Sequence, residues 1–395
     1  MIVRASHAVF SIRIRSYILK VSLFFFYFTF PPYHHSSSFR FFFFSDHNLA
    51  LTFSGTTNTS STPPMKDRRS LKIEFIDAEE YDVMRDRYNS AFHSDMQQVG
   101  QCGVVVYDGV DTWLEGARSF MKQPPWGQVK LSGGYLDEVK EIGNLVQLDA
   151  SRLTRAVKNS LYLPSLVTSI DECIAQHRKD SEVVAKTSTM IFCRLNECSM
   201  KQSTNYKVRP FSDGADVLDG LLRDGRVISW LANPKYNIRS TTIYLSDFDP
   251  SFACNNEYRV FVWKGRVTGI SQYRWFPTDE TEYHTEESAR CIGEDILYFM
   301  EGGDGLLSQL REHKRARQDL SAGNPSQASQ ESEELADDEN EIVLVADVVH
   351  TEGRVYLVEI NLFGGETGCG SCLFHWKRDE PVLYGDGKSV VCRFL

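Results

Sequence analysis

The sequence has no apolar run long enough to cross a lipid bilayer, which takes about 20 residues. Two aromatic stretches near the start of the chain, 21–30 and 39–44, come nearest, and both are too short. The nine cysteines are an odd number scattered over 395 residues, so they do not form the dense disulfide framework of a small secreted scaffold. These absences predict no membrane association for the folded body and favour a reducing compartment such as the cytoplasm.

The chain also lacks a second CxxC pair. Cys369 and Cys372 form a single pair, whereas a structural zinc site needs four ligands. The pair follows a predicted strand and does not open a helix, so its setting is not that of a redox motif. We therefore interpret this pair as structural.

Basic residues are in deficit. The chain holds 43 Lys and Arg against 53 Asp and Glu, a net charge of −10, and residues 1–64 contribute five basic residues against one acidic residue. The rest of the chain is therefore at −14. Sequence-independent binding of nucleic acid relies on basic surfaces that release counterions, so direct nucleic-acid binding is not expected. A basic or metal-bridged partner is favoured instead.

Residues 1–64 differ in kind from the remainder. They are basic, then strongly aromatic, and acidic residues are absent before Asp46. Three interpretations stay open: a dispensable leader upstream of a start at Met65, a secretory or mitochondrial targeting segment, and a membrane-associated tail. In each case we expect the segment to take no part in the fold.

The body of the chain predicts helices mixed with antiparallel strands. Its composition is that of an ordinary globular protein, with 42% hydrophobic and 24% charged residues. Short strand patterns with turn signals between them occupy 182–276 and 342–361, and apolar residues recur at helical spacing in 285–315. These patterns predict an α+β fold.

We expect two subdomains in this body. The range 65–185 forms a divergent N-terminal subdomain, and 186–395 forms the region that carries the chemistry. Within the second, residues 318–341 are acidic and nearly free of apolar side chains, so they are expected to be a disordered insertion.

The strongest chemical signal lies in the last predicted strand pair. Side chains alternate across a strand, so Glu359 and Asn361 share one face, and Asp347 lies between apolar residues in the partner strand. Two carboxylates and an amide oxygen are the hard ligands that suit Mg²⁺. The alternative is that these polar groups line the solvated face of an edge hairpin.

The magnesium hypothesis places a demand on the hairpin turn. For Asp347 to share a face with Glu359, the turn must contain an odd number of residues. A three-residue turn, 351–353, with Gly353 in the left-handed region satisfies this demand. A two-residue turn at 352–353 places Asp347 on the opposite face.

Two further segments contain basic residues on predicted strands. In 194–203, Arg194 and Asn196 share a strand face and Lys201 follows a short loop, an arrangement that can hold phosphate oxygens. In 257–275, Arg259 alternates with apolar residues. The alternative for 194–203 is basic residues that face solvent at a strand edge, which is the more usual case, and the alternative for 257–275 is a hairpin with one amphipathic arginine.

Taken together and in this order, the segments resemble the cell division cycle protein 123 family, an ATP-grasp group. The resemblance covers about 186–376, and its specific parts are E257-Y-R-V-F, G269-I-S-Q-Y, D347-V-V, V358-E-I-N-L-F-G364 and C372-L-F-H-W376. It implies an ATP-grasp-like fold in which two subdomains with antiparallel sheets sandwich a nucleotide. Family members are assembly factors for eukaryotic translation initiation factor 2 and bind its gamma subunit.

The resemblance also implies roles for particular residues. The implied phosphate contacts are Arg194, Asn196, Ser199 and Lys201, with Arg259 also assigned to cofactor binding. The implied adenine hinge is Ser246, Asp247 and Phe248, and the implied ligands of Mg²⁺ are Asp347, Glu359 and Asn361. The chain departs from the family at the hinge, where S246-D-F replaces basic and tryptophan residues, and throughout 65–185.

Three functions follow as hypotheses. The first is a nucleotide-dependent assembly factor that binds Mg·ATP and a client protein without being an enzyme. The second is an ATP-grasp ligase that joins a carboxylate to an amine through an acyl phosphate, which requires a second pocket for the acceptor. The third is a binding module that has lost its nucleotide.

Overall fold

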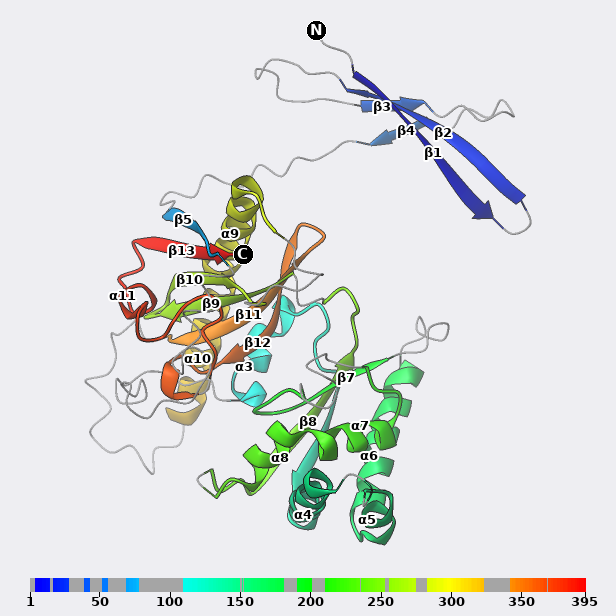
Figure 1. Ribbon diagram of the computed structural model, residues 1–395, viewed down its shortest axis with the longest axis vertical. Coiled ribbons are helices and arrows are strands. Elements are labelled where there is room, and N and C mark those ends of the chain that lie inside the picture. Colours follow the sequence, from blue (N-terminus) through cyan, green and yellow to red (C-terminus); the bar gives the residue numbers. More distant parts are fainter. Residues whose placement is uncertain are drawn as a thin grey trace. The chain divides into compact units, whose positions relative to one another are not determined.

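The computed structural model describes residues 69–77, 109–149, 151, 153–180, 190–200, 210–234, 236–252, 256–274, 283–322, 342–367 and 369–395, together with the backbone of four strands before residue 68. The chain divides into two units, Met1–Arg68 and Arg69–Leu395 (Figure 1). In the first unit, β1 (Arg4–Ile14) pairs with β2 (Tyr17–Tyr27), and β3 (Phe39–Phe42) pairs with β4 (Thr52–Gly55). No helix in the described ranges is long and apolar enough to cross a membrane.

The second unit contains a six-stranded sheet with the order β12-β11-β9-β10-β13-β5. Its strands are β5 (Ser70–Phe75), β9 (Glu257–Trp263), β10 (Arg266–Gln272), β11 (Leu344–Thr351), β12 (Arg354–Asn361) and β13 (Ser389–Phe394).

This sheet is mixed, which corrects the expectation of purely antiparallel sheets. The hairpin-connected strands do pair antiparallel, but β13 lies parallel to both β10 and β5. Short hairpins can join only antiparallel neighbours. The strands β5 and β13 come from opposite ends of the unit, so no hairpin fixes their direction.

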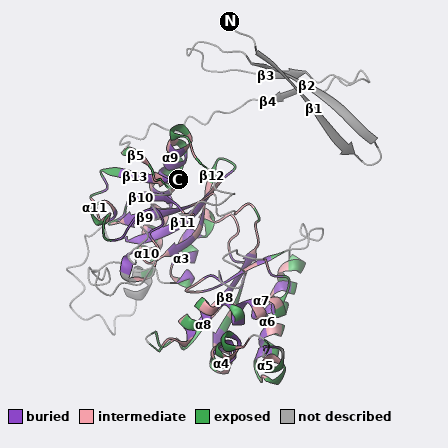
Figure 2. Ribbon diagram, viewed as in Figure 1, coloured by how far each residue is buried: buried purple, intermediate pink, exposed green. Residues whose placement is uncertain are grey.

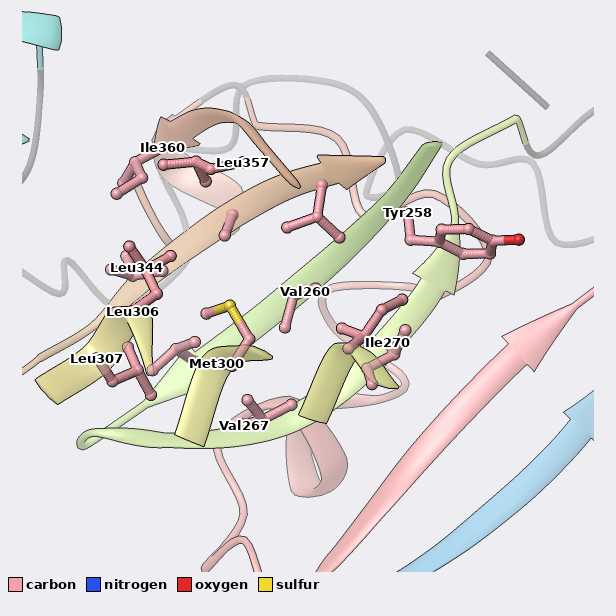
Figure 3. Close-up of a cluster of buried hydrophobic side chains, with 14 of the residues drawn as sticks. Tyr258, Val260, Val267, Ile270, Met300, Leu306, Leu307, Leu344, Leu357 and Ile360 are labelled. Atoms are coloured by element: carbon pink, nitrogen blue, oxygen red, sulfur yellow. The ribbon is translucent and has the colours of Figure 1, made fainter. Parts of the chain in front are cut away.

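Helices cover one face of the sheet. They are α3 (Val110–Ala117), α9 (Glu286–Glu301) and α10 (Leu306–Ala322). Helix α9 starts at the cap residue Thr285, whose side chain accepts a hydrogen bond from the Ser288 N–H, and it buries apolar residues three or four apart. Figure 3 shows the resulting core, with Met300, Leu306 and Leu307 over the strands that carry Val260, Val267 and Leu344.

The opposite face of the sheet is covered by the chain that follows β12. This segment contains the 3₁₀ turn η5 (Gly365–Thr367) and the short helix α11 (Glu380–Leu383). Phe363, Phe374 and Trp376 pack around Phe261 of β9, with ring centroids 5.4–6.4 Å apart. The sheet is therefore buried on both faces, as the colouring of Figure 2 shows for its central strands.

A second, three-stranded sheet has the order β6-β8-β7, and both of its pairs are antiparallel. Its strands are β6 (Gly127–Ser132), β7 (Ile191–Leu195) and β8 (Ser240–Asp247), and the 3₁₀ turn η2 (Arg118–Phe120) precedes β6. Its helices are α4 (Gly134–Leu148), α5 (Leu153–Asn159), α6 (Leu163–Asp180), α7 (Gly214–Arg223) and α8 (Gly225–Ala232). The sheet draws strands from both sides of residue 186, where the sequence placed a subdomain boundary.

The expected disordered insertion overlaps α10. The helix continues through Ala322, so residues 318–322 have helical backbone. Residues 323–341 lie outside the described ranges, and their expected disorder stays a prediction.

The start of α6 is held by a carboxylate from α4. Glu138 accepts hydrogen bonds from the Ser160 hydroxyl and from the backbone N–H groups of Leu161 and Tyr162, the latter two at 3.0 and 3.1 Å. Burial would raise the pKa of Glu138, but the hydrogen bonds from Ser160 and the backbone outweigh it and lower the pKa. An anion at a helix start is favourable because the first N–H groups there have no intrahelical partner.

We expect Glu138→Gln to lower the free energy of unfolding by about 1 kcal/mol at pH 7. Because the pKa of Glu138 is depressed from its ordinary value of 4.5, its contribution is present above that value and is lost as pH falls through the depressed pKa. Urea unfolding at a series of pH values measures this. The difference from wild type should shrink in acid, and the exposed Glu141→Gln on the same helix should show no difference at any pH.

Candidate functional site

The β11–β12 hairpin turns in two residues, not three. Thr351 pairs directly with Arg354, and the turn residues Glu352 and Gly353 have φ values of 55° and 69°. Both central residues are therefore left-handed, as a type I′ turn requires. The odd-numbered turn that the magnesium hypothesis required is therefore not present.

The predicted shared face is nevertheless confirmed, through a β-bulge. Val348 pairs with Leu357 and Asp347 pairs with Glu359, so Val358 is an extra residue in β12. One extra residue moves every later side chain of the strand to the other face. Asp347 therefore lies directly opposite Glu359, and Asn361 follows on the same face.

Arg259 completes the charged cluster from the neighbouring strand. It pairs with Asp347 across β9 and β11, and its Nε and Nη2 donate to the two carboxylate oxygens at 2.8 Å each. Asp347 is fully buried and Arg259 is 6% exposed. Burial disfavours the guanidinium charge, yet the adjacent Asp347 carboxylate holds the pKa of Arg259 well above its usual value. The arginine is thus a fixed structural cation.

The cluster belongs to a polar row that crosses the whole six-stranded sheet. Successive cross-strand partners are Glu359, Asp347, Arg259, Ser271, Arg393 and Glu74. The segment after β12 satisfies this row: the Gly370 carbonyl accepts from Arg259, the Leu373 N–H donates to Ser271, and Asp379 binds Arg393. The interpretation as a solvated edge hairpin is therefore excluded.

The CxxC pair lies in that covering segment. Burial raises the pKa of the Cys372 thiol to about 12, so the group is protonated at neutral pH. The Cys369 carbonyl accepts a hydrogen bond from the Trp376 indole at 2.7 Å. A protonated, buried thiol suits the structural interpretation of the pair.

Arg194 brings the second sheet to this cluster. Its Nη1 donates to Glu359 Oε2 at 2.9 Å, so a side chain of β7 meets a side chain of β12. Both side chains are more than 90% buried. Arg194 and Glu359 are 165 residues apart in the sequence. Their contact brings the basic motif at 194–203 together with the acidic motif of the β11–β12 hairpin.

The other three implied phosphate contacts, Asn196, Ser199 and Lys201, differ in their surroundings. The side-chain oxygen of Asn196 accepts a hydrogen bond from the Asp111 N–H at 3.0 Å, and its backbone carbonyl accepts one from the Val110 N–H. Asn196 therefore holds the start of α3. Ser199 is 2% exposed, and its buried hydroxyl has no hydrogen-bond partner among the described residues. Lys201 lies outside those residues.

The hinge residues divide between two faces of β8. Ser246 lies on the face of Arg194, because Tyr244 pairs with Arg194 and the alternation carries on to Ser246. Asp247 lies on the other face, where its Oδ1 accepts from the Trp126 indole at 3.1 Å and lies 3.3 Å from His177 Nε2. The Phe248 N–H donates to the Met190 carbonyl.

Two residues of β6 that the motif reading did not single out share the face of Arg194. Gln128 pairs with Tyr244, and Lys130 pairs with Thr242, so both alternate onto that face. Both are exposed. The alternation of residues in 127–132 carries this signal.

Lys122 is a further cation that sequence reasoning missed. Its Nζ lies 2.9 Å from Asp249 Oδ2 and donates to the Ser251 hydroxyl at 3.0 Å, and it lies 5.8 Å from the ring centroid of Tyr356 in β12. The hydrogen bond to Asp249 is the main cause of a raised pKa at Lys122. This lysine joins the end of β8 to the β11–β12 hairpin.

The residues fit Mg²⁺ by their chemistry. Asn361 Nδ2 donates to Asp347 Oδ2 at 3.0 Å and to Glu359 Oε1 at 3.3 Å, so two carboxylate oxygens from different strands approach one point. The two ends of an amide group occupy nearly the same volume, so Asn361 can present its oxygen there instead. Arg194 and Arg259 balance the two carboxylates, so the cluster can receive a metal together with an anionic triphosphate.

The candidate set contains two carboxylates and one amide. In the described ranges, no group of three or more His, Cys, Asp or Glu side chains is placed to hold a metal ion. The assignment to Mg²⁺ therefore depends on the amide of Asn361 and on oxygens supplied by the ligand, which is usual for this ion.

Comparisons with protein-family models and with curated proteins found no match. Among solved structures, the chain is similar to Cdc123 from Schizosaccharomyces pombe, with a TM-score of 0.46 and 15% identity over 73% of this chain and 96% of that chain. It is also similar to C-terminally truncated Cdc123 from the same organism, with a TM-score of 0.46 and 14% identity over 76% of this chain and 99% of that chain.

Proposed function

We propose that the chain binds Mg·ATP between its two sheets and acts as an assembly factor for eukaryotic translation initiation factor 2 through the gamma subunit. The observation that carries the nucleotide proposal is the buried contact of Arg194 with Glu359. It joins the sheet with the phosphate-binding motif to the sheet with the metal-binding motif. The client follows from the family resemblance and from the acidic charge of the body.

The residues around this contact divide the work of binding. Arg194 supplies a guanidinium that can form charge-assisted hydrogen bonds to phosphate oxygens, and Ser199 supplies a buried hydroxyl that has no partner among the described residues. Lys130 adds a second cation on the same face of the sheet. Asp347, Glu359 and Asn361 would hold Mg²⁺, which neutralises phosphate charge and orients the triphosphate when bound.

Arg259 has a positioning role in this proposal. Its bidentate pair fixes the rotamer of Asp347, and its donation to the Gly370 carbonyl ties the covering segment to the site. A ligand carboxylate held in this way keeps its oxygens oriented without cost at the moment of binding.

At the adenine end, the alternation along β8 separates Ser246 from Asp247. Ser246 shares the face of Arg194 and Phe248 directly follows the strand, whereas Asp247 is engaged with Trp126 and His177 on the other face. We therefore assign Ser246 and Phe248 to the base, and we assign Asp247 to the support of β8.

The client proposal predicts salt-sensitive co-purification. The full chain should retain the purified gamma subunit of initiation factor 2 in Mg·ATP at about 50 mM salt and lose most of it at about 500 mM, because salt screens the attraction of an acidic body to a basic client. Pull-down at the two salt concentrations measures this. If no complex forms at low salt while the chain still binds Mg·ATP, the client assignment is wrong and the nucleotide assignment stands.

A further inference from the structure

A cavity of about 310 Å³ lies away from the candidate nucleotide site, where the β9–β10 turn meets the junction of α9 and α10. Gly265, in its wall, is six residues along the chain from Arg259, which corresponds to roughly 20 Å of extended strand. Three arginines and one acid line it: Arg69, Arg266, Arg311 and Glu301. Residues 65–395 carry a net charge of −14, so a cavity with three arginines and one acid differs in sign from the rest of this region.

One arginine of the cavity is neutralised. Arg69 forms an ion pair with Glu301 and also donates to the Val267 and Gly387 carbonyls. Glu301 in turn accepts from the Val267 N–H at 2.6 Å. This pair is part of the wall and contributes no net charge.

The other two arginines keep donors for a ligand. Among the described residues, Arg311 has one side-chain hydrogen bond, from its Nη2 to the Gly265 carbonyl at 2.8 Å. The Arg266 side chain forms no hydrogen bond within the described part of the chain, and it is exposed beside an Asp386 that is already paired with Lys388. Two guanidinium groups therefore give the cavity an excess of two positive charges.

We infer that this cavity binds a small molecule through a phosphate group. A guanidinium can form a bidentate pair with two phosphate oxygens. Two guanidinium groups from different elements can bind a tetrahedral phosphate from two sides, which a planar carboxylate with only two oxygens does not match as well. The 17-residue helix α10 begins at the cavity with Leu306, and Leu307 and Ser308 of its first turn line the wall. The volume is at the lower end of ligand pockets, which favours a compact ligand over a nucleotide.

Inorganic phosphate titrated calorimetrically into the full chain tests this inference. Wild type should bind phosphate with a Kd in the millimolar range or tighter, and Arg266→Ala should weaken binding at least tenfold. Arg266→Lys keeps the positive charge but not the bidentate guanidinium, so it should reduce phosphate affinity by an intermediate amount. Since the Arg266 side chain forms no hydrogen bond to any described residue, the fold should be unaffected, which thermal unfolding of each variant checks.

Arg354→Ala is the matched control. Like Arg266, Arg354 is an exposed arginine that follows a two-residue X-Gly turn at the start of a strand. Its substitution by alanine should leave phosphate binding unchanged. The inference is overturned if wild type does not bind phosphate, if Arg266→Ala binds as well as Arg354→Ala, or if acetate binds wild type as tightly as phosphate does.

Discussion

Asp347→Ala should lower the free energy of unfolding by about 3–5 kcal/mol, the cost of leaving a buried charge without its partner. Asp347 is fully buried and receives two hydrogen bonds from Arg259 and one from Asn361. After the substitution Arg259 retains the Gly370 carbonyl but loses the counter-charge of Asp347. Urea unfolding followed by circular dichroism measures the loss.

Asp219→Ala is the control for this prediction. Arg223 Nε lies 2.8 Å from Asp219 Oδ1, the same distance as Arg259 Nε from Asp347 Oδ1, but the side chains of Arg223 and Asp219 are 41% and 37% exposed. An exposed pair contributes about 0–1 kcal/mol. If the two alanine variants lose the same stability, Asp347 is not the buried counter-ion described here.

The second large effect is expected at Glu359. Glu359→Gln should weaken Mg·ATP affinity by ten- to a hundredfold, because it removes a negative charge from the metal ligands. The glutamine oxygen can still accept from Arg194, so the contact between the two sheets is kept. Asn361→Asp should weaken affinity less, since it retains an oxygen ligand.

Glu352→Gln provides the control within the same hairpin. Glu352 lies in the exposed turn, so its loss of charge should leave Mg·ATP affinity unchanged in a calorimetric titration. Equal affinity in Glu352→Gln and Glu359→Gln would remove Glu359 from the metal ligands.

The sequence predicts the hairpins and places the candidate metal ligands on one face of the sheet. It does not predict the β-bulge that brings Asp347 onto that face. Period-two alternation places Glu359 and Asn361 together on any strand. The bulge at Val358 depends on pairing with β11, which is fixed by the rest of the sheet. A local pattern therefore predicted the right face with the wrong turn.

Other features of the site depend on strand order and could not be read locally. Arg259 pairs with Asp347 because β11 lies beside β9, although the two strands are about 80 residues apart in the chain. The division of the hinge, by contrast, was open to prediction. Alternation alone separates Asp247 from Ser246, and the family resemblance had grouped both with Phe248.

Calorimetric titration of ATP into the full chain, first with excess Mg²⁺ and then with EDTA, is the most direct test of the nucleotide proposal. Binding at one site per chain is predicted with Mg²⁺, and the affinity should fall at least tenfold when the metal is chelated, since Asp347 and Glu359 would then face the triphosphate without a cation between them. Absence of binding with Mg²⁺, or equal affinity in EDTA, would contradict the proposal.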